Sequence, residues 1–190
     1  MADTIRCFIA IDLPDELKNE IYSYITKLKA FSGCTKWVNA HTLHLTLKFL
    51  GEQPSEKVDA LIHEFSLSPP ITKTFQQNTL NLGAFPNKNK PRILWLGTES
   101  SPDNALLSLK KWIDFKLEPL GYEPDTQRFK PHLTLARVKI PEDFAELWNF
   151  VQNNPFPTQV FPVEDIVLMK SILKPSGAEY RILHKFALKK

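Results

Sequence analysis

The hydrophobic and polar positions of this chain repeat with two periods, one typical of helices and one typical of strands. After Pro14, apolar side chains recur every three or four positions, for example at Leu17, Ile21 and Leu28. This spacing predicts an amphipathic helix, and proline suits the first turn of a helix. Residues 5–13 are rich in β-branched and aromatic side chains, so they predict a buried strand.

The same two patterns continue along the chain in an intermixed order. We expect helices over residues 14–31, 55–65, 103–117 and 141–151. We expect strands over residues 5–13, 44–50, 72–82, 92–97, 132–138, 160–173 and 180–188, and a turn over 36–39. Asp103 and Pro141 are the predicted starts of the third and fourth helices. The prediction is an α+β fold with antiparallel neighbours at its end, because a short turn at 174–177 joins the last two strands.

One tetrapeptide, His-Leu-Thr-Leu, occurs at residues 44–47 and again at 132–135, about half a chain length later. Side chains two positions apart on a strand share a face, so each histidine and threonine point one way and the leucines the other. Only five histidines occur in the chain, so two in identical settings favour a functional site over two ordinary half-exposed strands. We interpret the repeat as a duplication within a single two-lobed domain, residues 1–190.

The repeated residues supply the groups that acid–base chemistry on a phosphate ester needs. Imidazole has an ordinary pKa of about 6.5, so one neutral ring can take a proton from water while one protonated ring gives a proton to a leaving oxygen. Threonine hydroxyls can donate hydrogen bonds to the phosphate oxygens. We therefore predict His44 and His132 as catalytic residues, and Thr46 and Thr134 as residues that bind the substrate.

No metal ion and no cofactor is expected at this site. Histidine metal sites usually include carboxylates or further histidines at short spacing, and neither copy of the tetrapeptide has them. The sequence also lacks the Gly-x-x-x-x-Gly-Lys and Gly-x-Gly-x-x-Gly loops that hold nucleotide phosphates.

Composition and charge narrow the ligand and the location. The chain has 24 Lys and Arg against 21 Asp and Glu, a net charge of +3. This small positive charge permits an anionic ligand, but a protein that coats nucleic acid is usually more basic. We therefore expect a local site for an RNA end or a short fragment.

Two cysteines, Cys7 and Cys34, predict no disulfide framework. The sequence shows no signal-peptide pattern, and its apolar runs are much shorter than the ~20 residues of a membrane-spanning helix. We therefore expect a cytoplasmic monomer that binds no membrane.

These residues resemble a known family. The paired His-x-Thr-x motifs are similar to those of the two-histidine phosphoesterases, and the chain looks most like the RNA 2′,3′-cyclic phosphodiesterases, also called 2′-5′ RNA ligases. The resemblance extends over nearly the full length, through residues 6–14, 44–52, 92–97, 131–137 and 171–188. It implies two pseudo-symmetric lobes, each an antiparallel sheet with flanking helices, around a V-shaped central cleft.

The resemblance also implies an activity. Members of this family open a 2′,3′-cyclic phosphate at an RNA end and leave a 2′-phosphate. By this resemblance His132 is the base that activates water, His44 is the acid that protonates the leaving 3′ oxygen, and Thr46 and Thr134 hold the phosphate. By microscopic reversibility the same pair can also join an RNA 5′-hydroxyl to the cyclic phosphate.

Several residues near the motifs are further candidates for substrate binding. Arg137 lies five positions after His132; alternation places it on the opposite face unless the strand bulges, while the resemblance favours a ligand role. Phe49, five positions after His44, fits either the core or a platform for a terminal base. Lys130, like Arg128, lies before the second motif and suits either the RNA path or a solvated loop.

Two neighbouring side chains have simpler predictions. Lys48 lies four positions after His44, so it is expected to share the histidine's face. The four tryptophans, Trp95 among them, are expected to be mostly core residues.

Two other functions compete with the RNA cyclic phosphodiesterase. One is a phosphodiesterase of the same superfamily that acts on a small cyclic nucleotide or a 2′-5′ oligonucleotide. The other is a non-catalytic module that binds RNA ends, although the intact histidine and threonine of both motifs speak against it.

Overall fold

The computed structural model describes residues 3–33, 35–101, 104–140, 143–175 and 177–190. These residues form helices α1 (Asp15–Leu28), α2 (Ser55–Leu67), α3 (Ala105–Leu117) and α4 (Ala145–Asn153). The strands are β1 (Thr4–Asp12), β2 (Thr35–Trp37), β3 (His44–Pro54), β4 (Phe75–Phe85), β5 (Ile93–Ser101), β6 (His132–Val138), β7 (Val160–Val163), β8 (Asp165–Lys174) and β9 (Gly177–Ala187). The α+β prediction is confirmed. None of the described helices is long and apolar enough to cross a membrane.

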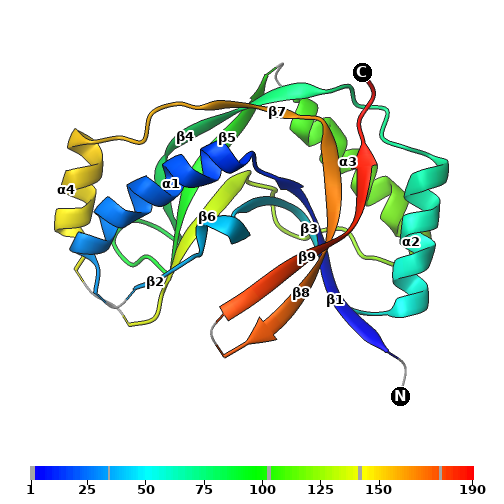
Figure 1. The fold of residues 1–190 in the computed structure, drawn as a ribbon, viewed down its shortest axis with the longest axis horizontal. Coiled ribbons are helices and arrows are strands. Elements are labelled where there is room, and N and C mark those ends of the chain that lie inside the picture. The colour runs from blue at the N-terminus through cyan, green and yellow to red at the C-terminus, as the bar shows by residue number, and fades with distance from the viewer. Residues whose placement is uncertain (1–2, 34, 102–103, 141–142, 176) are drawn as a thin grey trace.

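All nine strands belong to one curled sheet, in the order β7-β4-β5-β6-β3-β1-β8-β9, with β2 also paired to β6 (Figure 1). Every pair of neighbouring strands is antiparallel. The sheet has two similar halves, β3-β1-β8-β9 and β6-β5-β4-β7, which meet where Leu45 of β3 pairs with Leu133 of β6. The two copies of the tetrapeptide therefore lie side by side at the centre of the sheet.

The order β1, α1, β3, α2 is repeated as β5, α3, β6, α4. Helices of the two halves pack on one another, α1 beside α4 and α2 beside α3. At one end of the molecule the Tyr24 hydroxyl of α1 donates to the carbonyl of Asn154, just after α4, at 2.9 Å (Figure 1). At the other end α2 packs on α3, where the Phe65 and Trp112 rings are 4.8 Å apart. Each end of the molecule thus pairs one helix from each half of the chain, which ties the two halves together.

The core lies between the sheet and these helices. Leu45, Leu47, Leu133 and Leu135 are all buried in the main hydrophobic cluster, as the tetrapeptide predicts. A second, smaller cluster on the other face of the sheet is built around Phe8 of β1. Both faces of the central strands are therefore partly covered, one by helices and one by a few apolar side chains.

Some details differ from the prediction, and others fall outside the described residues. The strand expected over 160–173 is two strands, because the chain crosses at Glu164 from β7, which pairs with β4, to β8, which pairs with β1. The turn expected over 36–39 begins inside β2, which exists only because β6 supplies its hydrogen-bonding partner. The predicted helix starts Asp103 and Pro141, together with Cys34, lie outside the described residues.

Candidate active site

The site is built on the face of β3 and β6 that points away from the main core. Leu45 and Leu133 pair across the two strands, and both are fully buried on the core side. Since successive side chains alternate, the residues on either side of each leucine point to the opposite face. We call this surface, defined by His44, Thr46, His132 and Thr134, the histidine face. All four of its side chains are half-buried.

The antiparallel register arranges the four side chains as a crossed pair. Leu45 lies opposite Leu133. In an antiparallel pair, one step back along β3 matches one step forward along β6, so His44 lies opposite Thr134. One step in the other direction places Thr46 opposite His132. Each imidazole therefore adjoins the hydroxyl of the other strand. This pseudo-twofold arrangement suits a small anion that is contacted from two sides.

Each histidine is fixed by a hydrogen bond to its own chain. Nδ1 of His44 lies 2.7 Å from the carbonyl oxygen of Thr42, and Nδ1 of His132 lies 2.7 Å from the carbonyl oxygen of Lys130. A carbonyl oxygen only accepts, so Nδ1 of both rings must carry the hydrogen and donate. Nε2 of each ring is thereby left for proton transfer with a substrate.

The surroundings of the two rings differ in charge. Burial is the largest influence on both, and it lowers the pKa of His44 and of His132 below the ordinary imidazole value. The carboxylate of Asp12, the β1 partner of His44, acts to raise the pKa of His44, against Lys18 and the other histidine. Lys130 and Arg137 both act to lower the pKa of His132. Within the described part of the chain, a carboxylate therefore acts on His44, whereas only cations are among the charged groups that act on His132.

Two matching β-bulges bring the fifth residue after each histidine to the histidine face. The pairing of β1 with β3 skips Leu47, and the pairing of β5 with β6 skips Leu135. Each bulge shifts the alternation by one residue, so Phe49 and Arg137 join their histidines. Phe49 is 70% exposed, so its interpretation as a core residue is wrong. A ligand role for Arg137 required a bulge between His132 and Arg137, and β6 has one at Leu135.

The same bulge removes Lys48 from the histidine face. Lys48 pairs with Ile9 of the main core, and its side chain is only 5% exposed. Its Nζ donates to the carbonyl of Glu123 at 2.7 Å and to the Asp125 carboxylate at 2.9 Å. The prediction that Lys48 shares a face with His44 is wrong, because that prediction assumed unbroken alternation.

Aromatic rings flank His44 on the first half of the sheet. The Phe8 ring lies 4.7 Å from the imidazole of His44, and the Tyr180 ring of β9 lies edge-on at 5.0 Å. Phe8 and Phe49 are cross-strand partners whose rings are 6.0 Å apart. These rings cover one side of His44, and the Phe49 ring leaves most of its surface exposed.

Aromatic rings also flank His132 on the second half. The Phe85 ring meets His132 edge-on at 5.0 Å, and the ring of Trp95, the β5 neighbour, is 6.2 Å away. Trp95 was expected in the core, but it is half-buried beside His132, so that prediction is wrong. Lys130 places its Nζ 4.7 Å from the centre of the Trp95 ring. The structure thus brings Lys130 to the edge of the site.

Sequence reasoning missed several of these neighbours. Tyr180, Phe85 and Asp12 reach the histidines only through the pairing of strands that are distant in sequence. Lys36 of β2 is the direct partner of Arg137, so both cations lie on the histidine face. A pattern along one strand cannot show which residue lies beside it on the next. Within the described ranges, no three His, Cys, Asp or Glu side chains gather in a way that could hold a metal ion.

Two His-x-Thr-x strands that pair at the centre of one antiparallel sheet, with their polar side chains on one face, define a two-histidine phosphoesterase. The comparisons with known proteins give the family. The chain belongs to the 2′-5′ RNA ligase superfamily, whose family model matches residues 13–174.

Similar proteins share nearly the full length of the chain. An RNA 2′,3′-cyclic phosphodiesterase of Methanocaldococcus jannaschii is 33% identical over 184 residues, 96% of this chain and 100% of the relative. One from Thermus thermophilus is 34% identical over 198 residues, 97% of this chain and 91% of the relative. Among solved structures, a Thermus thermophilus protein has a TM-score of 0.79 at 32% identity, covering 97% and 98% of the two chains. The complex of E. coli LigT with 3′-AMP has a TM-score of 0.76 at 27% identity, covering 99% and 100%.

Proposed function

We propose that this protein is an RNA 2′,3′-cyclic phosphodiesterase that leaves a 2′-phosphate and needs no metal ion. The observation that carries the proposal is the pair of imidazoles on the histidine face, each with Nδ1 fixed to a backbone carbonyl and Nε2 left for the substrate. Relatives that match nearly the whole chain bear this enzyme name. Both motifs come from one sheet of one chain, which supports a monomer and a single domain over residues 1–190.

The reaction follows from the two proton-transfer atoms. Nε2 of neutral His132 accepts a proton from water as the water oxygen bonds to phosphorus. The bond between phosphorus and the ribose 3′ oxygen breaks, and Nε2 of protonated His44 gives its proton to that oxygen. The product is a 2′-phosphate beside a free 3′-hydroxyl, and proton exchange with solvent resets the pair. With an RNA 5′-hydroxyl in place of water, the same steps join two RNA ends by a 2′-5′ bond.

The other groups of the histidine face are proposed to bind and stabilise the phosphate. Thr46 and Thr134 donate hydrogen bonds to its non-bridging oxygens, whose charge grows in the transition state. Arg137 contributes a positive charge from β6. Phe49 provides a surface on which the terminal base can stack. Lys130 contributes a second cation at the edge of the site, beside His132.

The test is a hydrolysis assay with purified protein and a short RNA that ends in a 2′,3′-cyclic phosphate, with and without EDTA. We expect hydrolysis at the same rate in both, and chromatography against 2′- and 3′-phosphate standards should identify the 2′-phosphate. A strict metal requirement, or a 3′-phosphate product, would contradict the proposal.

The pH dependence should reflect the lowered pKa of both histidines. Below the pKa of His132 the base is protonated, and above the pKa of His44 the acid has lost its proton, so activity falls on both sides. Since burial lowers both pKa values, kcat/KM should be greatest below about pH 6.5. The bound phosphate anion raises both pKa values, so the optimum of kcat should lie at higher pH. A kcat/KM optimum above about pH 7.5 would show that the rings are not desolvated in this way.

A further inference from the structure

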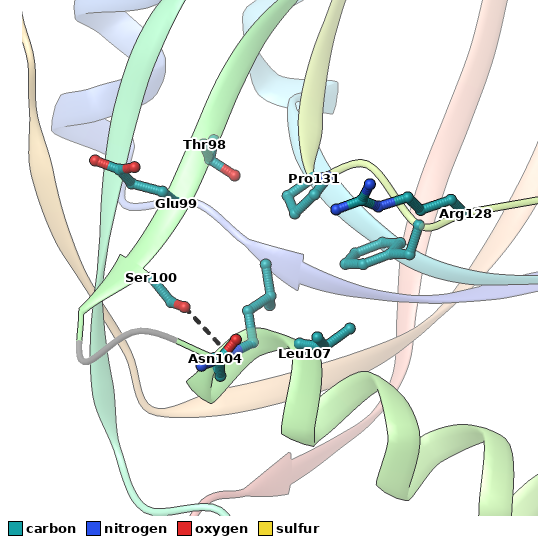
Figure 2. A pocket seen from close by; sticks show the side chains of 9 residues that line it. Thr98, Glu99, Ser100, Asn104, Leu107, Arg128 and Pro131 are labelled. Atoms are coloured by element: carbon teal, nitrogen blue, oxygen red, sulfur yellow. Dashed lines mark hydrogen bonds between the residues drawn. The ribbon is translucent and has the colours of Figure 1, made fainter.

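A groove beside the site is not used by the proposed reaction. It has a volume of about 440 Å³ and lies between the end of β5, the start of α3 and the segment before β6 (Figure 2). Arg128 and Pro131 line one wall, and Ser100, Asn104 and Leu107 line the other. This volume is in the range of cavities that bind small organic molecules.

The groove continues toward the histidine face. A second cavity of about 370 Å³ shares Thr98 and Pro131 with the first. Its wall includes Trp95 and Lys130, the two side chains that flank His132. The two cavities therefore adjoin at Thr98 and Pro131, and we call them together the hollow; Trp95 and Lys130 line one part of it and Arg128 lines the other.

The walls of this hollow suit a nucleotide. Lys130 and Arg128 provide two cations for one phosphodiester, while Trp95 and Phe129 provide aromatic surface. The backbone of β5 contributes as well. β6 pairs with β5 only as far as Gly97, whereas β4 pairs with it through Ser101. Among the described residues, positions 98–101 thus lack a strand partner on the side of β6, and their backbone groups are available to the edge of a base.

The cationic wall is held in place before any ligand binds. Asp125, three residues before Arg128, receives Nζ of Lys48 at 2.9 Å and Nζ of Lys110 at 2.8 Å. At the other end of the segment, the carbonyl of Lys130 accepts the Nδ1 hydrogen of His132. The backbone that carries Arg128 and Lys130 therefore lies between two anchored points, which lowers the cost of ordering this segment on binding.

We propose that this hollow binds the nucleotide on the 5′ side of the cyclic-phosphate end, with its phosphodiester between Lys130 and Arg128. The inference rests on the proposed function and adds a second nucleotide position to it. The protein would then prefer an RNA end to a free cyclic mononucleotide.

The test compares adenosine 2′,3′-cyclic phosphate with a trinucleotide that ends in the same group. The wild-type protein should show a lower KM for the trinucleotide. Arg128→Ala should raise the trinucleotide KM about tenfold with kcat unchanged, and should leave the mononucleotide kinetics unchanged. It should also reduce the slope of log KM against log salt by about 0.7, the value for one phosphate contact on a single strand. Leu107→Glu, on the exposed opposite wall, should weaken the trinucleotide in the same selective way.

Lys27→Ala, which removes an exposed cation from α1, is the matched control and should change neither substrate. Equal KM values for the two substrates in the wild type would overturn the inference. So would an Arg128→Ala variant that affects both substrates equally or neither. Hydrolysis of neither substrate by the wild type would instead contradict the proposed function itself, so the two failures are distinct.

Discussion

Alanine in place of His132 is expected to lower kcat for a 2′,3′-cyclic phosphate by about 10²–10⁴-fold, the usual contribution of one positioned base. His44→Ala should cause a loss of the same order, because the 3′ oxygen then leaves without a proton. Neither change should affect folding much, since both rings are half-buried at the edge of the core. Rates from initial velocities, with thermal unfolding of each variant as a check, measure the effect.

A second substrate separates the two roles. A p-nitrophenyl phosphodiester has a leaving group that departs without protonation, so His44→Ala should recover most of its activity on it while His132→Ala stays slow. His63→Ala, which removes an exposed histidine from α2, is the control and should behave as wild type. If His44→Ala is as slow on this substrate as on RNA, the assignment of His44 as the acid is wrong.

Asp125→Ala is expected to lower the free energy of unfolding by about 1–3 kcal/mol. The substitution removes a carboxylate that pairs with both Lys48 and Lys110, which are only 5% and 4% exposed. Lys110 keeps its ion pair with Asp114, whereas Lys48 keeps only the carbonyl of Glu123 at 2.7 Å and a longer contact to Asp114 at 3.8 Å. Removing one partner of a fully buried pair costs about 3–5 kcal/mol, but the Asp125 side chain is 45% exposed and solvent screens part of the interaction. Urea unfolding followed by tryptophan fluorescence measures the change.

Two variants and a pH series make this prediction specific. Asp15→Ala is the control, because the Asp15 carboxylate is 85% exposed and lies 3.8 Å from Nζ of Lys18. Lys18 keeps its closer partner, Asp12, at 2.8 Å. We expect the free energy of unfolding to fall by less than about 0.5 kcal/mol. Adding Lys48→Met to Asp125→Ala should restore part of the stability, because it removes a buried charge that has lost its nearest carboxylate. A double variant less stable than Asp125→Ala would argue against the ion pair as the cause.

The pH series follows from the pKa of Asp125. Burial acts to raise this pKa, but hydrogen bonds and charges from Lys110 and Lys48 outweigh it and hold it below its ordinary value. A carboxylate with a lowered pKa in the folded state stabilises the protein above its unfolded pKa, about 3.9, and loses that effect as pH falls through the folded pKa. The difference between wild type and Asp125→Ala should therefore be full at pH 6 and shrink below about pH 4.

Much of the fold could be predicted because its elements have strong local patterns. The helix after Pro14 and the two motif strands follow from apolar spacing within one segment, which needs no partner to be visible. The boundary inside residues 160–173 could not be predicted in this way. Residues 160–173 form one run of strand-favouring side chains, and only the different partner strands of β7 and β8 separate the two.

Much of the site depends on bulges and pairing instead. Perfect alternation predicts that Lys48 joins His44 and that Phe49 faces the core, and the extra residue Leu47 reverses both. Whether a bulge forms depends on the register of β1 against β3, which is a property of two strands and of the packing beneath them. The place of Trp95 beside His132 is set in the same way, by the pairing of β5 with β6.

The sequence by itself determined that two identical strands carry His44 with Thr46 and His132 with Thr134 on one face, because alternation along a strand is a local property. Only the tertiary structure decided how those residues can act. It pairs the strands at Leu45 and Leu133, fixes the hydrogen on each Nδ1, and sets Asp12 beside His44. These contacts join residues that are distant in sequence, so they exist only once the sheet has closed around its core.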